Sequence, residues 1–100
     1  MAENAGPADH QRLDKWLWFA HVMRTRRGAQ EIAVSGHVRL GGKRVSSASQ
    51  QVRAGDVLTI ALEGRVRVLE VVGFALRRGN AAAAARLFRD HSPPPPGRDA

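Results

Sequence analysis

One contiguous segment carries all of the net charge of this 100-residue chain. Nine of the sixteen Lys and Arg residues lie between Arg12 and Arg53, where the only acids are Asp14 and Glu31, so this window holds the whole formal charge of +7. The residues before the window carry −2 and those after it +2, so they balance each other. Because the window also shows the patterns of short helices and a hairpin, its cations should lie on a folded surface, which is typical of a face that binds a polyanion.

The size and composition of the chain allow one small domain. We expect disordered tails at residues 1–11 and at the proline-rich residues 91–100, which leaves roughly 80 residues, 12–90, for folding. A second, catalytic domain has no room. The chain contains no cysteine, which excludes disulfides and thiolate metal sites and fits a reducing compartment. No signal-peptide pattern and no apolar run near the ~20 residues that span a bilayer are present, so we expect a cytoplasmic protein without membrane contact.

The N-terminal part of the domain shows two helical patterns. Leu13, Trp16, Leu17 and Ala20 follow the spacing of a helix with one buried stripe. Thr25 is a suitable N-cap for a second helix, whose apolar positions again share one face and which Gly36 would end. Helices joined by so few residues should pack as a hairpin.

The rest of the domain predicts antiparallel strands and one more helix. Gly41 and Gly42 supply the turn of a β-hairpin, and two further strands are expected over Val57–Leu62 and Arg65–Phe74. Asn80 could cap a last helix, Ala81–Asp90. The predicted fold class is therefore α+β, an N-terminal helical hairpin packed on a small antiparallel sheet (helix, helix, β-hairpin, further strands) with a short C-terminal helix.

Five short motifs resemble a known family. From about Arg12 to Leu62 the chain is similar to the RNA-binding domain named after the fourth small-subunit ribosomal protein, through the motifs Arg12–Trp18, Arg24–Arg26, Ser35–Val38, Gly42–Arg44 and Ala54–Asp56. Within that superfamily, the Asp-Lys-Trp-Leu-Trp opening, the small size and an alanine-rich segment after the sheet look most like the ribosome-associated family of bacterial fifteen-kilodalton heat-shock proteins. The five motifs occur in the family's order and with its natural spacing.

The resemblance implies a function. It implies a non-enzymatic protein that binds ribosomal RNA of the large subunit and, under stress, rescues or recycles free large subunits that carry stalled peptidyl-tRNA. We expect a monomer in the free state. The chain departs from the family at its end, because a proline-rich segment from Ser92 replaces the family's longer charged helix.

The predicted RNA-binding residues cluster at the second helix and the hairpin. A helix N-terminus at Thr25 offers free backbone N–H groups, and adjacent guanidinium groups can bind phosphate oxygens. Asp14 should orient a basic neighbour, Trp16 should be core, and Trp18 could be a surface residue or a base-stacking residue. The predicted contacts are Arg12, Lys15, Arg24, Thr25, Arg26, Arg27, Gln30, Ser35, Gly36, His37, Lys43 and Arg44.

Other function classes remain to be weighed against RNA binding. The four histidines show no spacing typical of a nucleophile or metal site, so we predict no catalytic residues, metal or cofactor. Phosphate contacts alone do not distinguish RNA from DNA, so non-specific DNA binding is expected as well. The alternatives left open are a ribosome-assembly factor and a general nucleic-acid-binding protein.

Overall fold

The structure is a computed structural model that describes residues 9–94. The tails predicted at the two ends fall largely on residues 1–8 and 95–100, which lie outside the described residues. No helix in the described part is long and apolar enough to cross a membrane. The elements follow in the order β2 (His10–Arg12), α1 (Leu13–Phe19), α2 (Arg26–Val34), β3 (Val38–Leu40), β4 (Lys43–Arg44), β5 (Gln51–Arg53), β6 (Val57–Leu62), β7 (Arg65–Val71), α3 (Ala81–Ala85) and β8 (Phe88–Asp90).

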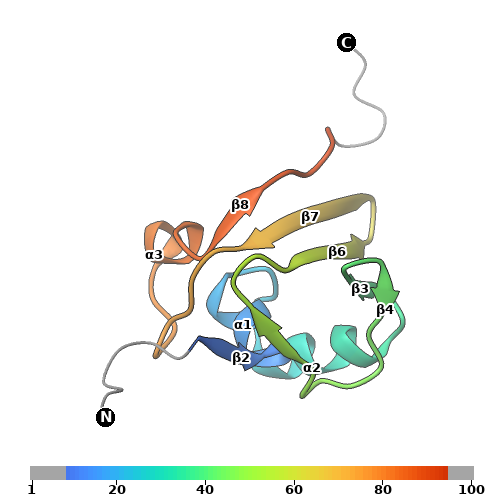
Figure 1. Ribbon diagram of the computed structural model, residues 1–100, viewed down its shortest axis with the longest axis horizontal. Coiled ribbons are helices and arrows are strands. Elements are labelled where there is room, and N and C mark those ends of the chain that lie inside the picture. The colour runs from blue at the N-terminus through green and yellow to red at the C-terminus, as the bar shows by residue number, and fades with distance from the viewer. Residues whose placement is uncertain (1–8, 95–100) are drawn as a thin grey trace.

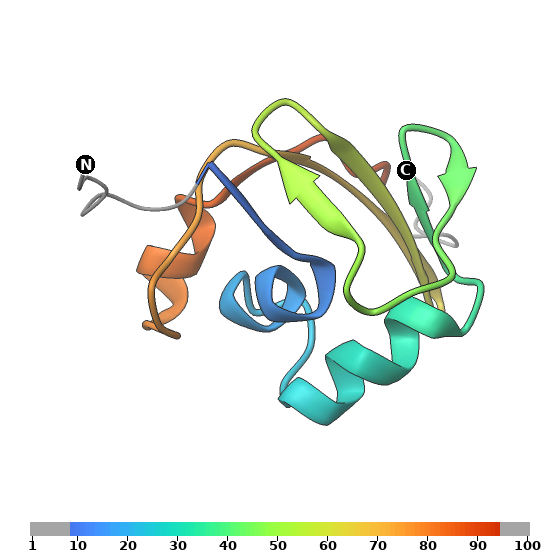
Figure 2. The same cartoon turned by 60° about the horizontal axis from the view of Figure 1, so that its bottom comes forward.

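The strands form two antiparallel sheets. The larger has the order β4-β3-β6-β7-β8, and the smaller pairs β2 with β5. Figures 1 and 2 show α1 and α2 together on one side of the larger sheet, with α3 beyond the end of α1. The two helices therefore cover the face of the sheet that carries the buried side chains of β6 and β7.

The core lies between α1, α2 and the larger sheet. Alternate residues of β6 and β7 point into it, with Leu58 opposite Leu69 in the antiparallel register. Trp16 is fully buried, as the helical spacing predicts, and its indole Nε1 donates to the carbonyl of Gly73 at 3.0 Å. This hydrogen bond ties α1 to the segment that follows β7.

Several local predictions are confirmed. The Thr25 hydroxyl accepts a hydrogen bond from the Gly28 N–H at 2.9 Å, and the Asn80 side chain accepts one from Ala83 at 2.9 Å, so both residues cap helices. Gly36 and the two hairpin glycines have positive φ angles. At such positions glycine is favoured because it has no Cβ to clash.

The predicted arrangement of an N-terminal helical hairpin followed by a β-hairpin, further strands and a C-terminal helix is wrong. The described part of the chain has strand β2 before α1, and His10 and Gln11, assigned above to a tail, pair with β5. The larger sheet has five strands, and the last of them lies within the predicted Ala81–Asp90 helix. That helix ends at Ala85 because the next residues join the sheet edge: the Leu87 carbonyl accepts from Val72, and β8 then pairs with β7.

Candidate nucleic-acid interface

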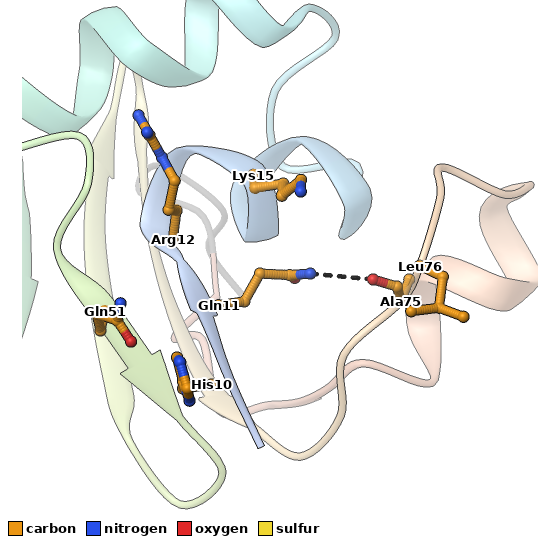
Figure 3. Close-up of a pocket in the computed structure, with 7 residues that line it drawn as sticks. All are labelled: His10, Gln11, Arg12, Lys15, Gln51, Ala75 and Leu76. Atoms are coloured by element: carbon orange, nitrogen blue, oxygen red, sulfur yellow. Dashed lines mark hydrogen bonds between the residues drawn. The ribbon is translucent and has the colours of Figure 1, made fainter. Parts of the chain in front are cut away.

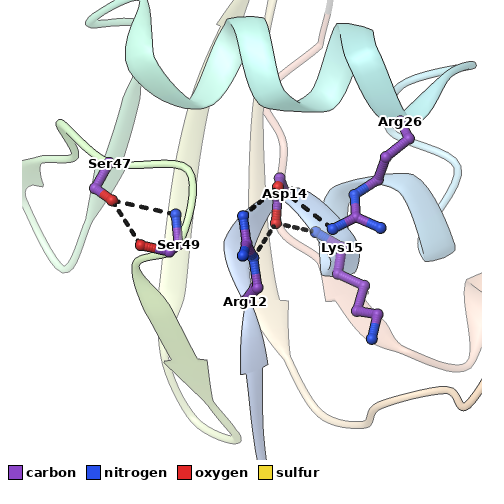
Figure 4. A network of polar contacts seen from close by, with 6 residues as sticks. All are labelled: Arg12, Asp14, Lys15, Arg26, Ser47 and Ser49. Carbon is purple, nitrogen blue, oxygen red and sulfur yellow. Dashed lines mark hydrogen bonds and ion pairs between the residues drawn. The ribbon is translucent and has the colours of Figure 1, made fainter.

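A buried carboxylate lies at the centre of the cationic segment. Asp14, at the start of α1, is the one buried charged residue in the described part of the chain, with 0% of its surface exposed. Arg12 donates from Nε to Oδ1 at 3.1 Å and from Nη2 to Oδ2 at 3.0 Å, which is a bidentate pair. Arg26 Nη2, from the first turn of α2, lies 3.5 Å from Oδ2, and the backbone N–H of Lys15 donates to Oδ1 at 2.8 Å. Asp14 thus joins two elements and confirms the prediction that it orients a basic neighbour (Figure 4).

Within the triad of Asp14, Arg12 and Arg26, the ion pairs favour the charged carboxylate of Asp14 and the charged guanidinium of Arg12. Burial by itself raises the pKa of Asp14, but the hydrogen bond from Arg12 and the charges of Arg26 and Arg12 outweigh it, so the pKa lies below its usual value. In turn, the hydrogen bond and charge of Asp14 raise the pKa of Arg12. Asp14 and Arg12 therefore stabilise each other's charged forms.

In the triad the carboxylate is buried and the two guanidinium groups are partly exposed. The side chains of Arg12 and Arg26 are 47% and 34% exposed, whereas the Asp14 side chain is fully covered. An approaching phosphate would meet two positioned guanidinium groups and no exposed carboxylate oxygen. Such a pair can bind phosphate oxygens without first paying the entropy of ordering long side chains.

The N-terminus of α2 adds backbone donors beside Arg26. Within the described residues, no hydrogen bond uses the backbone N–H groups of Arg26 and Arg27, whereas Gly28 donates to the Thr25 cap. Free N–H groups and the positive end of the helix dipole favour an anion here. The Arg27 side chain extends into solvent, where its Nε lies 3.3 Å from Glu31 Oε2.

A second group of predicted residues lies where α2 ends and the β3–β4 hairpin begins. The Ser35 hydroxyl donates to the Ile32 carbonyl at 2.8 Å, and His37 Nδ1 lies 2.7 Å from the Ser35 Oγ. The His37 side chain is exposed beside this contact. The Arg44 guanidinium Cζ lies 3.8 Å from where a Gly36 Cβ would stand, an ordinary van der Waals distance, so glycine is favoured here by the positive φ angle of Gly36.

The loop that follows Arg44 connects this second group to the triad. The N–H groups of Leu13 and Asp14 donate to the carbonyls of Gln50 and Ala48, at 2.7 and 3.2 Å. The Ser47 and Ser49 hydroxyls lie 2.8 Å apart in this loop, and Figure 4 shows Arg12 between them and Asp14. These hydrogen bonds hold the loop after Arg44 against the start of α1, next to Arg12.

Most of the predicted residues lie in two groups, and a few lie apart from both. Arg12 and Arg26 share Asp14, Ser35 contacts His37, and the Arg44 guanidinium lies near Gly36. Lys15 lines one pocket beside Arg12, and Lys43 lines another beside Arg44. Among the described residues, no hydrogen bond or ion pair joins the exposed side chains of Arg24, Arg27 and Gln30 to either group.

The structure also bears on residues outside the predicted set. The half-buried Trp18 ring stacks on Phe19 with a centroid distance of 5.4 Å, and the Arg78 guanidinium lies 5.5 Å from its centroid. A base that stacked on Trp18 would compete with these contacts. Sequence reasoning missed Gln50 and Gln51, which line the two pockets beside the cations. The signal that could have found them is a pair of amide side chains in a polar segment between two basic motifs.

Comparisons with known proteins show what the chain is similar to. Residues 11–58 match the family model described as the S4 domain. The chain is 36% identical over 84 residues to heat shock protein 15 of Escherichia coli K12, which covers 84% of this chain and 62% of that protein. It is 39% identical over 69 residues to small ribosomal subunit protein uS4 of Lysinibacillus sphaericus, covering 69% of this chain and 34% of that one. The trimeric structure of Vibrio cholerae heat shock protein 15 superposes with a TM-score of 0.75 at 30% identity, covering 81% of each chain.

Proposed function

The chain belongs to the S4-domain family, and we propose that it is a non-enzymatic, ribosome-associated protein that binds ribosomal RNA. It spans 62% of the length of the Escherichia coli heat shock protein 15 and about a third of that of uS4, so the activity of those whole proteins comes to this chain as a proposal. The names of these relatives connect the family with the ribosome and with the heat-shock response. A cytoplasmic location accords with both.

The observation that carries the proposal is the pair of guanidinium groups held by a buried acid. Arg12 lies in β2 and Arg26 in the first turn of α2, and Asp14 contacts both guanidinium groups. Structured RNA is recognised mainly through its shape, its phosphates and its 2′-hydroxyl groups. A rigid face of positioned donors suits this task, and it predicts affinity for folded RNA with little sequence specificity.

The resemblance to heat shock protein 15 supports a more specific role. We propose that the RNA is that of the large ribosomal subunit, and that the protein acts on free large subunits that retain stalled peptidyl-tRNA. The cationic face would bind the ribosomal RNA, and the rescue of the subunit would follow from that binding.

Co-sedimentation with purified ribosomal subunits tests both levels of the proposal. The full chain should pellet with large subunits and less with small subunits, and more with large subunits that carry peptidyl-tRNA than with empty ones. Equal binding to both subunits and to duplex DNA would instead indicate a general nucleic-acid-binding protein. Absence of binding to either subunit, and to ribosomal RNA alone, would refute the proposal as a whole.

A further inference from the structure

A segment outside the S4 domain lies against β2 and α1. Residues 72–80 connect β7 to α3, and they follow the part of the chain that matches the S4 domain. In Figure 2 this connecting segment descends beside β2 and α1 before it reaches α3. Three side chains contact its backbone carbonyls: Trp16 Nε1 donates to Gly73 at 3.0 Å, Gln11 Nε2 donates to Ala75 at 3.0 Å (Figure 3), and His21 Nε2 lies 2.8 Å from the Gly79 oxygen. The connecting segment is therefore held in place along its length.

The connecting segment carries two arginines that keep their charge. The Arg78 guanidinium lies over the Trp18 ring, 5.5 Å from its centroid. Such a cation–π contact holds a guanidinium without neutralising it. Among the described residues, neither Arg78 nor its exposed neighbour Arg77 forms an ion pair. Both charges therefore stay available to an anion.

These arginines lie next to the cations of the S4 domain. A pocket of about 320 Å³ has Arg12 and Lys15 in its lining on one side and Ala75 and Leu76 on the other, as Figure 3 shows. Because Arg77 directly follows Leu76, its exposed side chain starts beside the same pocket. The two groups of cations are thus neighbours on the surface, although they are far apart in the sequence.

The pocket between the two groups offers an anion little opposition. Its lining contains no acid. Among the described residues, the acids that pair with lining residues are Asp14, which is fully buried, and Asp9, which pairs with His10 at 2.8 Å. Lys15 forms no ion pair in the described part of the chain. An anionic backbone can therefore bind both Lys15 and Arg77 without breaking a salt bridge.

We propose that the RNA-binding face continues beyond the S4 domain onto the connecting segment, where Arg77 binds a further phosphate of the same RNA. The RNA backbone passes Arg12 and Lys15, crosses the pocket and reaches Arg77, while Arg78 adds positive charge beside it. Because contacts with β2 and α1 already hold the segment, RNA binding does not have to order it. The inference rests on the proposed function and adds a phosphate contact that the S4 domain alone does not supply.

Fluorescence anisotropy with isolated ribosomal RNA tests this contact. Arg77→Ala should weaken binding about fivefold, the loss expected for one hydrogen-bonded phosphate. It should also make the dependence of log affinity on log salt shallower by about 0.7, the share of one phosphate. Arg77→Lys keeps the charge and should retain most of the affinity and the full salt dependence.

The matched control is Arg65→Ala. Arg65 is also exposed, and it begins β7, at the end of that strand opposite to the connecting segment. Its replacement removes the same charge and should change neither the affinity nor the salt dependence. Circular dichroism should show an unchanged fold for both alanine variants, because both side chains are exposed.

Three results would overturn the inference. Arg77→Ala could bind ribosomal RNA with the affinity and salt dependence of the unmodified protein, so that Arg77 contacts no phosphate. Arg65→Ala could lose as much affinity as Arg77→Ala, so that only the net charge matters. Arg77→Ala could bind isolated ribosomal RNA normally but no longer co-sediment with large subunits, so that the connecting segment contacts a ribosomal protein.

Failure of this inference and failure of the proposed function give different results. If Arg26→Ala with Arg27→Ala weakens the binding of ribosomal RNA and Arg77→Ala does not, only the extension of the face is refuted. If the unmodified chain binds neither ribosomal RNA nor ribosomal subunits, the proposed function fails and the inference fails with it.

Discussion

The N-terminal and C-terminal parts of the molecule both carry many arginines but use them differently. In the C-terminal strands β7 and β8, Arg67 and Arg89 pair with acids on the neighbouring strand, and His91, just after β8, contacts Glu70 of β7. The closest nitrogen–oxygen distances are 3.2 Å for Arg67–Asp90, 3.8 Å for Arg89–Glu70 and 3.0 Å for His91–Glu70. These pairs neutralise one another across the sheet.

The N-terminal part instead concentrates its cations around a single buried acid. Between Arg12 and Arg53 nine cations face two acids, and one of those acids, Asp14, is shared by two arginines. Asp14 therefore positions two of the cations, while this part keeps its net positive charge. The comparison teaches that the position of the acids, as well as the number of arginines, decides which surface can bind an anion.

The largest expected effect separates the two parts by RNA affinity. Arg26→Ala with Arg27→Ala should weaken binding to ribosomal RNA about 100-fold, or about 2.7 kcal/mol, because two charge-assisted phosphate contacts are lost. The fold should persist, since Arg12 still pairs with Asp14, and circular dichroism can check this. The matched control is Arg65→Ala with Arg86→Ala, two exposed arginines of the C-terminal part. Equal losses in the two double variants would show that the binding face is not where we place it.

The next largest effect concerns the buried acid itself. Asp14→Asn preserves the shape of the side chain but removes its charge, and should lower the free energy of unfolding by about 2 kcal/mol, as expected for hydrogen bonds to a charged group. Because the pKa of Asp14 is lower in the folded state, its contribution is present above the unfolded value of about 3.9 and is lost as the pH falls through the folded value.

Urea denaturation at a series of pH values measures this difference. At neutral pH the unmodified protein should have a higher free energy of unfolding than Asp14→Asn, and this difference should disappear in acid. Glu63→Gln, at an exposed carboxylate, is the control and should show no gap. A gap that does not change with pH would mean that the charge of Asp14 contributes nothing.

A third effect is the salt dependence of RNA binding. If the N-terminal face contacts about five phosphates, each contributing a slope of about −0.7, affinity should fall about tenfold for each doubling of salt. The Arg26→Ala, Arg27→Ala variant should show a shallower dependence, and the Arg65→Ala, Arg86→Ala control the same one as the unmodified protein. Fluorescence anisotropy at several salt concentrations measures these slopes, and a flat response would rule out phosphate contacts as the basis of binding.

The smallest effect is expected from an acid of the C-terminal sheet. Asp90→Asn removes a pair between partly exposed side chains, which should cost about 0.5 kcal/mol or less. Its affinity for RNA should not change, because the Arg67 side chain also lies over the Phe88 ring at 5.5 Å and stays in place. Thermal denaturation and RNA titration of this variant provide the measurement. A large rise in RNA affinity would show that acids in the C-terminal part suppress a second binding face.

Local signals in the chain were read correctly where a few neighbouring residues decide the outcome. Thr25 and Asn80 cap helices because their side-chain oxygens reach N–H groups three residues away. Gly36 and the hairpin glycines adopt positive φ angles for a reason equally local. The prediction that Asp14 orients a basic neighbour succeeded through Arg12, only two residues away.

Strands β2 and β8 were missed because each is three residues long and depends on a distant partner. Residues 10–12 carry no alternation of apolar and polar positions, and they become a strand only by pairing with residues 51–53. The Ala81–Asp90 segment has the composition of a helix, but the pairing of Phe88 with Val71 draws its second half to the sheet. Helical propensity in a short segment is weak enough for such contacts to override it.

The amino-acid sequence by itself determined where the charge is concentrated, which residues cap the helices and where the chain turns, since each of these depends on composition or on nearby residues. Only the tertiary structure decided that Asp14 is buried between Arg12 and Arg26, and that Gln11 faces Ala75 across a pocket. Gln11 and Ala75 are 64 positions apart in the sequence. Contacts over such separations arise from the packing of whole elements, so no short stretch of sequence contains the information that sets them.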